Sequence, residues 1–264
     1  MKNDIELTDK EFNLFQKIVF KEIGIFLENS KKFLLKNRLL KQLLIYNLTS
    51  YSDYYRLIQV NKNEKIKMLN LITTNETYFF REKRHFDFIE NSVIPFVDKL
   101  RVWSAACSTG VEAYSVAMLL DNSNIKYEII GSDVNTDVVK KANIGLYPVK
   151  MMAKIPEDLK IKYCLKGKGN YEGLFLVDRI LITNMDFQNR NLLDSHIDLG
   201  LFDIVFLRNV LIYFSDEMKE KIIRNVIKNL KVGGYIIVSL TEHIHELDKY
   251  NLEKIDSSIF KKVC

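Results

Sequence analysis

The amino-acid pattern changes near residue 100, and this change limits the possible fold more than any other feature of the sequence. From Arg101 onward, short apolar runs alternate with amphipathic segments, which is typical of a parallel sheet covered by helices on both faces. The apolar runs predict strands at 101–105, 127–131, 203–207 and 235–240, and the segments between them predict helices at 112–120, 136–142 and 215–230. Ser215 is expected to begin the last helix, and Gly233 with Gly234 to stop it. We therefore expect a doubly wound α/β domain over residues 96–264.

The residues before this change follow a helical pattern without a strand signal. Thr8 and Glu11 make a capping box, and apolar residues then recur at helical spacing until Gly24. Further helices are predicted at 30–47, 52–60 and 64–72. We expect a small all-helical domain over residues 1–72 and a connecting segment over residues 73–95.

Positive charge is concentrated in the helical part. The chain has a net charge of +5, and residues 1–70 hold 13 Lys or Arg against 8 Asp or Glu, so the remainder is balanced. Lys31, Arg38 and Lys41 gather on one side of the second predicted helix. This basic face is expected to dock on an acidic surface, which could belong to a nucleic acid, a membrane or an acidic protein helix.

Cysteine and histidine usage predicts neither disulfides nor a metal site. The three cysteines are widely separated without a Cys-x-x-Cys pair, and the four histidines lack ligand spacing. The sequence also lacks a secretory signal pattern and any apolar stretch long enough for a membrane span. We expect a soluble, cytoplasmic protein without a metal.

The alternation of strands and helices lapses between residues 145 and 190. Residues 173–178 followed by 180–184 predict a β-hairpin, preceded by the glycine-containing stretch 166–173. We interpret this region as a small inserted β-subdomain.

Candidate binding residues follow the predicted strands. The small residues of Ser104–Gly110 let the backbone approach a nucleotide-like ligand, although they also fit a plain tight turn. Asp133 closes the second strand, where a carboxylate accepts both hydroxyls of a ribose; its alternative role is a helix cap. Asn191 and Leu192 combine an amide with an apolar surface, which suits an adenine ring.

Two further segments carry polar groups beside aromatic residues. Arg208–Phe214 places two hydrogen-bonding side chains and an aromatic pair directly after a predicted strand, and Thr73–Glu82 surrounds three aromatic residues with polar groups. Such segments also occur with a purely structural role, in which the aromatic residues pack in the core beneath a capped linker. Together with Val102–Gly110, however, they resemble the CheR family of chemotaxis protein-glutamate O-methyltransferases over nearly the entire chain.

This resemblance implies a class I methyltransferase-like sheet that binds S-adenosyl-L-methionine and releases S-adenosyl-L-homocysteine. It implies methylation of glutamate side chains of methyl-accepting chemotaxis receptors, to methyl esters, for sensory adaptation. The implied cofactor-binding residues are Asn75, Thr77, Arg81, Glu112, Asp133, Asn191, Leu192, Asn209 and Val210. The implied catalytic residues are Arg81, for the incoming carboxylate or that of the cofactor, and Tyr213, close to the transferred methyl group.

The chain departs from the family pattern at two places. Val111 and Ala113 replace an acid and a proline that relatives commonly have, and we expect Glu112 to meet the cofactor's amino group. Ser239–Glu242 replaces the usual Gly-His-Ser-Glu near the last strands.

A glutamate carboxylate is already anionic at pH 7, so its methylation requires positioning rather than a general base. The expected partner is the cytoplasmic domain of a receptor, with the β-subdomain loop 166–173 binding the receptor's C-terminal tail peptide in a subset of the family. We expect a monomer that binds no nucleic acid and does not insert into membranes. The alternatives are an RNA methyltransferase and a non-catalytic protein that binds S-adenosylmethionine and docks on receptors.

Overall fold

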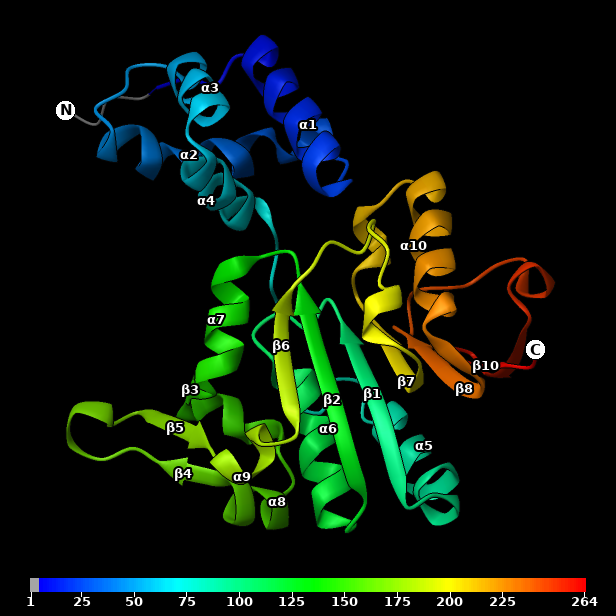
Figure 1. The fold of residues 1–264 in the computed structure, drawn as a ribbon. Coiled ribbons are helices and arrows are strands. Elements are labelled where there is room, and N and C mark those ends of the chain that lie inside the picture. Colours follow the sequence, from blue (N-terminus) through cyan, green and yellow to red (C-terminus); the bar gives the residue numbers. More distant parts are fainter. Residues whose placement is uncertain (1–4) are drawn as a thin grey trace. The chain divides into compact units, whose positions relative to one another are not determined.

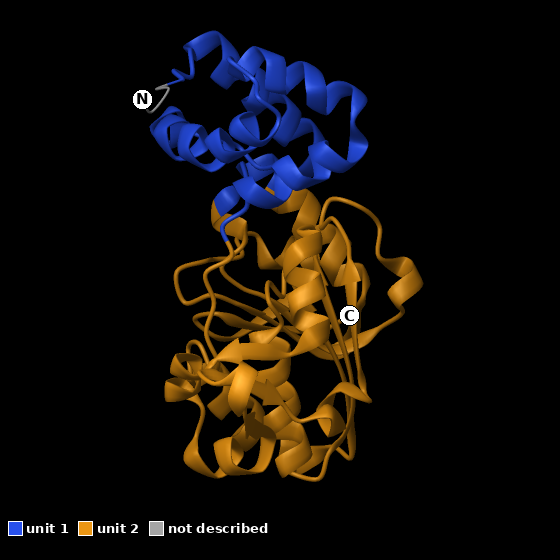
Figure 2. Ribbon diagram, turned by 90° about the vertical axis from the view of Figure 1, so that its left-hand side faces the viewer, with its two compact units in different colours: residues 1–74, 213–218 blue, residues 75–212, 219–264 orange. Residues whose placement is uncertain are grey.

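The computed structural model describes residues 5–264, which divide into two compact units (Figure 2). The first contains the chain up to Thr74 together with Tyr213–Met218, and the second contains Asn75–Ile212 and Lys219–Cys264. No helix among residues 5–264 is long and apolar enough to cross a membrane.

The first unit is helical, as predicted. Its elements are α1 (Asp9–Ile23), the 3-10 turn η1 (Asn29–Lys31), α2 (Lys32–Ile45), α3 (Tyr51–Val60) and α4 (Lys62–Ile72). The capping box at Thr8 and Glu11 is present, and Gly24 ends α1 with a φ of 72°. Glu11 also accepts hydrogen bonds of 2.8 Å from the backbone and hydroxyl of Ser52, so one carboxylate ties α1 to α3.

The prediction of an exposed basic face is wrong at Arg38. This side chain is half-buried and donates hydrogen bonds to the carbonyls of Ile72 and Thr73, at the end of α4. Because the last carbonyls of a helix lack partners within it, a guanidinium there acts as a C-terminal cap. Only Lys31 and Lys41 of the predicted face are exposed.

The second unit is built on a seven-stranded sheet in the order β6-β2-β1-β7-β8-β10-β9 (Figure 1). The strands are β1 (Lys99–Ala105), β2 (Lys126–Asp133), β6 (Met185–Asn189), β7 (Phe202–Leu207), β8 (Leu230–Val238), β9 (Leu252–Asp256) and β10 (Ile259–Lys262). The first five in this order are parallel, whereas β10 runs antiparallel to both of its neighbours. The carboxyl ends of β1, β2 and β7 therefore meet at one edge of the sheet.

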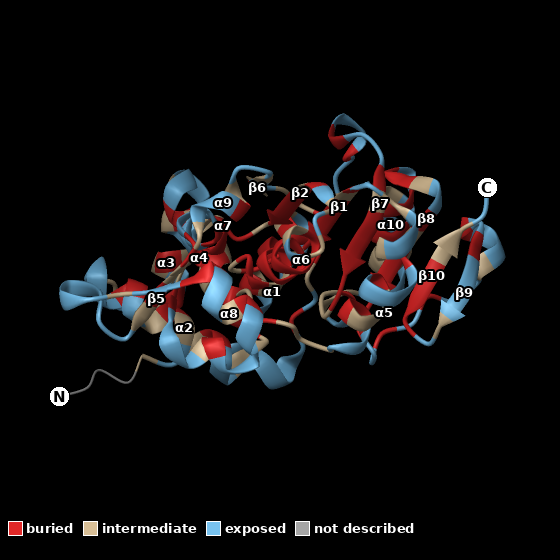
Figure 3. Ribbon diagram, turned by 90° about the horizontal axis from the view of Figure 1, so that it is seen from below, coloured by how far each residue is buried: buried red, intermediate tan, exposed pale blue. Residues whose placement is uncertain are grey.

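Helices cover this sheet. They are α5 (Arg84–Ser92), α6 (Val111–Asn122), α7 (Thr136–Ile144) and α10 (Asp216–Lys228), with 3-10 turns η2 (Ile94–Phe96), η5 (Ile197–Leu199), η6 (Leu211–Tyr213) and η7 (Leu247–Tyr250). Helices α6, α7 and α10 were predicted, whereas α5 lies within the segment 73–95 that was expected to be a linker. Side chains of α5 and α6 share one core cluster with Val102, Ile129 and Ile204 of the central strands. Strand β7 and helix α6 are almost entirely buried (Figure 3).

One helix end was predicted wrongly. Helix α10 ends at Lys228, and Gly233 and Gly234 lie inside β8 rather than at the helix terminus. Gly233 has a φ of 82°, and the pairing of β7 with β8 shifts register in this region. The two glycines thus accommodate an irregularity at the start of the strand.

The inserted region contains a second, antiparallel sheet in the order β3-β5-β4. Its elements are β3 (Leu146–Pro148), η3 (Val149–Lys154), α8 (Glu157–Tyr163), β4 (Cys164–Lys166), η4 (Gly169–Tyr171), β5 (Leu174–Val177) and α9 (Arg179–Ile182). The predicted hairpin partner at 180–184 is wrong, because Asp178 accepts a hydrogen bond from the backbone N–H of Ile180 and begins α9. Strand β5 pairs instead with the two strands that precede it.

Helix α5 is anchored to the turn between β9 and β10 by a buried histidine. The Nε2 atom of His85 lies 2.7 Å from the hydroxyl of Ser258, and the neighbouring Arg84 pairs with Asp256 at 2.6 Å. Burial, and then the charge of Arg208, lowers the pKa of His85 to about 4, although Glu82 and Asp256 favour its charged form. The folded protein therefore holds this imidazole neutral.

We expect the free energy of unfolding to fall by about 2 kcal/mol between pH 7 and pH 5 because of His85. The unfolded chain binds a proton below a pKa of about 6.5, whereas the folded chain does so only near 4, so acid favours unfolding in this interval. Urea denaturation of a His85→Gln variant, which keeps a donor or acceptor for Ser258, should show a flatter pH dependence. The exposed His243→Gln is the control, and equal slopes in His85→Gln and the wild type would contradict the assignment.

Candidate functional site

The turn after β1 brings the backbone close to the edge of the sheet. Gly110 has a φ of 85°, and a Cβ atom there would lie 2.8 Å from the Cβ of Ala142, so only glycine fits. Ala106 and Ser108 also have positive φ values, of 64° and 51°. The backbone N–H of Cys107 donates to the carbonyl of Ser132 at 2.9 Å, which fixes this turn against β2.

Asp133 holds the same turn from the end of β2. Its two carboxylate oxygens accept hydrogen bonds of 2.9 Å from the backbone N–H groups of Ser108 and Asn135. Burial nevertheless raises the pKa of Asp133, because these backbone donors offset only part of the lost hydration. Each oxygen retains a second lone pair, so further hydroxyl donors such as those of a ribose would stabilise the anion.

Another residue fills the helix-cap role that was the alternative for Asp133. The side chain of Asn135 accepts hydrogen bonds from the N–H groups of Asp137 and Val138 and is the N-cap of α7. Asp133 fixes the residue that caps the helix, while its own carboxylate lies at the turn after β1.

The predicted adenine-binding pair lies in the loop after β6. Asn191 accepts a hydrogen bond of 3.1 Å from the backbone of Leu193 through its side-chain oxygen, and Leu192 is buried. Asn225 of α10 donates to the carbonyls of Leu193 and Asp194, at 3.1 and 3.0 Å. Upstream, the backbone N–H of Arg190 donates to the Asp133 carbonyl at 3.0 Å. This loop is therefore tied both to α10 and to the end of β2.

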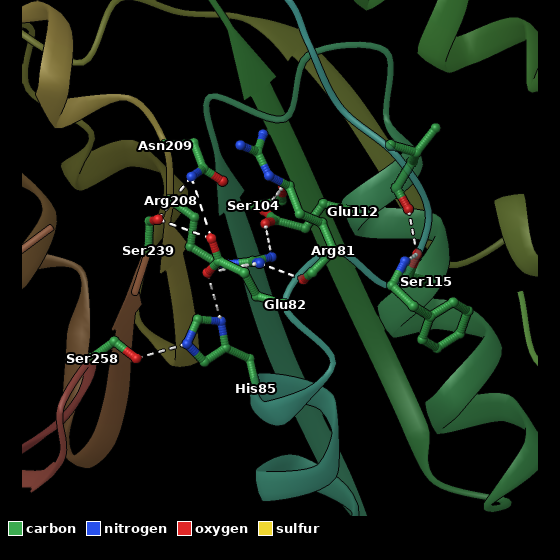
Figure 4. A network of polar contacts seen from close by, with 12 residues as sticks. Arg81, Glu82, His85, Ser104, Glu112, Ser115, Arg208, Asn209, Ser239 and Ser258 are labelled. Carbon is green, nitrogen blue, oxygen red and sulfur yellow. Dashed lines mark hydrogen bonds and ion pairs between the residues drawn. The ribbon is translucent and has the colours of Figure 1, made fainter. Parts of the chain in front are cut away.

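A buried guanidinium connects two carboxylates at the end of β7 (Figure 4). The Arg208 side chain is only 1% exposed, and its Nη1 lies 2.7 Å from Glu112 while its Nη2 lies 3.2 Å from Glu82. Nη2 also donates to the backbone carbonyl of Arg81. The second carboxylate oxygen of Glu112 accepts a hydrogen bond of 2.7 Å from the hydroxyl of Ser104 on β1.

Residues Ser239–Glu242 form the other side of this hydrogen-bond network. The second oxygen of Glu82 accepts a hydrogen bond of 2.9 Å from the Ser239 hydroxyl. Glu242 accepts hydrogen bonds from the backbone N–H groups of Asn209 and Ser239, at 2.8 and 3.0 Å. Burial would raise the pKa of Glu82, but the Arg208 charge and the surrounding donors outweigh it and lower that pKa.

The segment from Asn75 to Glu82 lies against the start of α6. The carbonyl of Asn75 accepts a hydrogen bond of 3.1 Å from the Ser108 hydroxyl, and the backbone of Phe80 donates to the Ser115 hydroxyl at 3.0 Å. Phe79 is fully buried beneath the segment. The guanidinium of Arg81 donates to the carbonyl of Glu76 at 3.0 Å, so this half-buried side chain is held by its own segment.

Several predicted site residues share these connected segments, and others lack a described contact to the network. Asn75, Arg81, Glu112 and Asn209 belong to the segments around Arg208, while Asp133, Asn191 and Leu192 lie along the joined ends of β2 and β6. Thr77 and Val210 are half-buried within the same two segments as Arg81 and Asn209. Tyr213 belongs to the first compact unit, with residues 214–218.

Local sequence patterns assign no role in this network to Glu82, Ser104 or Glu242. Arg208 has a partial signal, because a charged residue directly after an apolar strand indicates a site at the end of that strand, but its two partners cannot be read from the sequence. At the departure from the family pattern, Val111 is fully buried, whereas the carboxylate of Glu112 reaches the network.

Two family models match the chain, one for each predicted domain. The model described as the all-alpha domain of CheR methyltransferases matches residues 10–73, and the model described as their SAM binding domain matches residues 75–260. Together they cover both the helical domain and the sheet that carries the site.

Curated relatives agree with these models over nearly the full length. A chemotaxis protein methyltransferase of Borreliella burgdorferi is 31% identical over 98% of this chain and 96% of the relative. The protein of the same name from Escherichia coli is 32% identical over 94% and 90%, and chemotaxis protein methyltransferase 1 of Pseudomonas aeruginosa is 33% identical over 94% and 96%. With both domains matched and the strand-end segments arranged as described, the chain belongs to the CheR family of methyltransferases.

Proposed function

We propose that this chain methylates glutamate side chains of methyl-accepting chemotaxis receptors, giving glutamate methyl esters. One observation carries the proposal: the match to CheR methyltransferases extends over the helical domain as well as the cofactor-binding domain. The sheet alone would be compatible with many methyl acceptors, RNA among them. The relatives are named chemotaxis protein methyltransferases. A helical domain of the same family therefore favours a chemotaxis protein as the methyl acceptor.

The chain is an S-adenosylmethionine-dependent methyltransferase, and its cofactor supplies an electrophilic methyl group. The chain's own residues suit the polar parts of that molecule. Asp133 would accept the ribose hydroxyls, Asn191 and Leu192 would hold the adenine ring, and Glu112 would accept from the amino group. Asp133 ends β2, Asn191 and Leu192 follow β6, and Glu112 lies in the first turn of α6.

The acceptor carboxylate requires orientation rather than activation. A glutamate side chain with an ordinary pKa near 4.3 is anionic at pH 7, so no base has to remove a proton. Arg81 would orient that carboxylate through its planar guanidinium, and Tyr213 would assist with its hydroxyl. Catalysis then rests on alignment and on exclusion of water.

The test is incubation with methyl-labelled cofactor and the cytoplasmic fragment of a receptor, followed by mild alkali. Label in a glutamate ester is released as methanol, whereas label on an RNA base or a protein nitrogen survives. Alkali-stable label, or label that enters added RNA in place of receptor, would overturn the proposal.

We expect Asp133→Asn to weaken binding of S-adenosylhomocysteine about 10- to 100-fold, because a charged acceptor of two hydroxyls becomes a neutral one. Calorimetric titration measures the affinity. The matched control is Asn135→Ala, which removes the cap of α7 and should cost about 1 kcal/mol of stability with little change in affinity. If Asn135→Ala weakens binding as much as Asp133→Asn, the carboxylate acts only through the helix cap.

Arg81→Ala is expected to reduce turnover of receptor about 100-fold, since the acceptor carboxylate loses its orientation. Arg81→Lys should not restore turnover, because an ammonium lacks the planar fork. Initial rates of receptor methylation measure the effect, and Glu76→Ala is the control because it keeps the carbonyl that Arg81 contacts. Near-normal turnover of Arg81→Ala would remove Arg81 from the site, and a parallel loss of S-adenosylhomocysteine affinity would assign it to the cofactor.

The β-subdomain offers a place for a receptor tail peptide. Among residues 5–264, strands β3 and β4 are the two outer strands of the small sheet, and an extended peptide could add to such an edge. Lys166 ends β4 and Lys168 lies in the loop that follows, and the side chains of Leu165 and Tyr171 are exposed. A weak tether at this edge would raise the local concentration of receptor glutamates.

We expect a peptide from the C-terminal tail of a cognate receptor to bind the intact protein at least about tenfold more tightly than a variant lacking Gly167–Asn170. Fluorescence titration with a labelled peptide measures both affinities, and unchanged S-adenosylhomocysteine binding shows that the variant is folded. Equal affinities would reject the tether and leave the methyltransferase assignment in place.

A further inference from the structure

One side chain, Arg208, joins three separate segments at the carboxyl edge of the sheet. It extends from the end of β7, contacts Glu112 in the first turn of α6, and contacts both Glu82 and the Arg81 carbonyl in the segment before α5. Figure 4 shows Arg208 between the two carboxylates. Arg208 itself therefore has no free access to solvent or to an acceptor protein.

The charge balance of this cluster depends on the same side chain. Glu82 and Glu112 have side chains that are 15% and 14% exposed, and Arg208 supplies the cation that both contact. Two carboxylates held close together away from solvent repel each other when they lack a counter-charge, so Arg208 is needed to keep both side chains in place.

The geometry at Glu112 goes beyond simple charge neutralisation. One of its oxygens accepts from Arg208 at 2.7 Å and the other from Ser104 at 2.7 Å, so the carboxylate plane is fixed by donors on β7 and β1. Each oxygen keeps a second lone pair that points to neither donor. Such a carboxylate is oriented before any ligand arrives.

We propose that Arg208 is a positioning residue for cofactor binding: it holds the Glu112 carboxylate oriented toward the cofactor's amino group, with Ser104 fixing the other oxygen and Glu82 anchoring the guanidinium. This inference rests on the proposed role of Glu112 as the acceptor for that amino group. It assigns no contact between Arg208 and the cofactor or the methyl acceptor.

The test measures affinity for S-adenosylhomocysteine by calorimetry, together with stability in urea. Arg208→Met should bind about 10- to 100-fold more weakly. Arg208→Lys should restore only part of the affinity, since an ammonium supplies a charged donor to Glu112 without the fork that also holds Glu82.

A charge-balanced variant separates positioning from stability. Arg208→Met combined with Glu82→Gln removes one cation and one anion, so it should regain stability over Arg208→Met alone. If Arg208 positions Glu112, affinity stays low in this double variant. If affinity recovers together with stability, Arg208 serves folding only and the proposal is overturned.

Glu112→Gln distinguishes a failure of this inference from a failure of the proposed function. It should weaken binding about as much as Arg208→Met. Unchanged affinity in Glu112→Gln would overturn the role of Glu112 and with it the role of Arg208. The alkali test of the methylated product would be unaffected by that result.

Discussion

The carboxyl edge of the sheet depends on one buried cation, Arg208, that is shared between two half-buried acids. A carboxylate loses much of its hydration when buried, and an ion pair offsets that loss only when its geometry is good and the remaining lone pairs are used. Here Arg208 contacts Glu82 and Glu112, and the other oxygens accept from Ser239 and Ser104. Because these groups come from five parts of the chain, the cluster is satisfied only when all of them have reached their final places.

Strained backbone conformations are concentrated at the same carboxyl edge of the sheet. Residues 5–264 include nine non-glycine residues with positive φ, and five of them lie around the site: Phe80, Glu82, Ala106, Ser108 and Asn209. Each such conformation costs about 1 to 3 kcal/mol and persists only where surrounding contacts determine it. The contacts are visible at Asn209, whose N–H donates to Glu242 and whose amide donates to Ser239. The hydrogen-bond network thus holds the strand-end turns in shapes that free turns would not adopt.

Sequence patterns were sufficient for the central strands and the larger helices, because those segments bury a continuous or periodic apolar face. Sequence patterns did not predict segments whose structure depends on pairing with strands that are distant in the sequence. Strand β6 (Met-Asp-Phe-Gln-Asn) and strand β9 (Leu-Glu-Lys-Ile-Asp) are polar edge strands that become strands only beside β2 and β10. Glu82 and Arg208 are well over a hundred residues apart in the sequence, so no local sequence pattern predicts their contact. Candidate site residues could be predicted from the family resemblance, whereas the long-range contacts that hold their segments, such as that of Glu82 with Arg208, could not.

The proposed acceptor of the methyl group is a carboxylate, and the protein carries carboxylates of its own near the strand ends. These acids differ from an incoming glutamate in how fully their oxygens are engaged. Glu82 accepts from Arg208, Ser239 and the backbone of Leu240, and Glu242 accepts from backbone N–H groups on two segments. Hydrogen bonds from charged and backbone donors withdraw electron density and restrict the orientation of these oxygens, which makes them poorer nucleophiles than a glutamate arriving from solvent. The network would therefore also distinguish the protein's own acids from the proposed glutamate substrate.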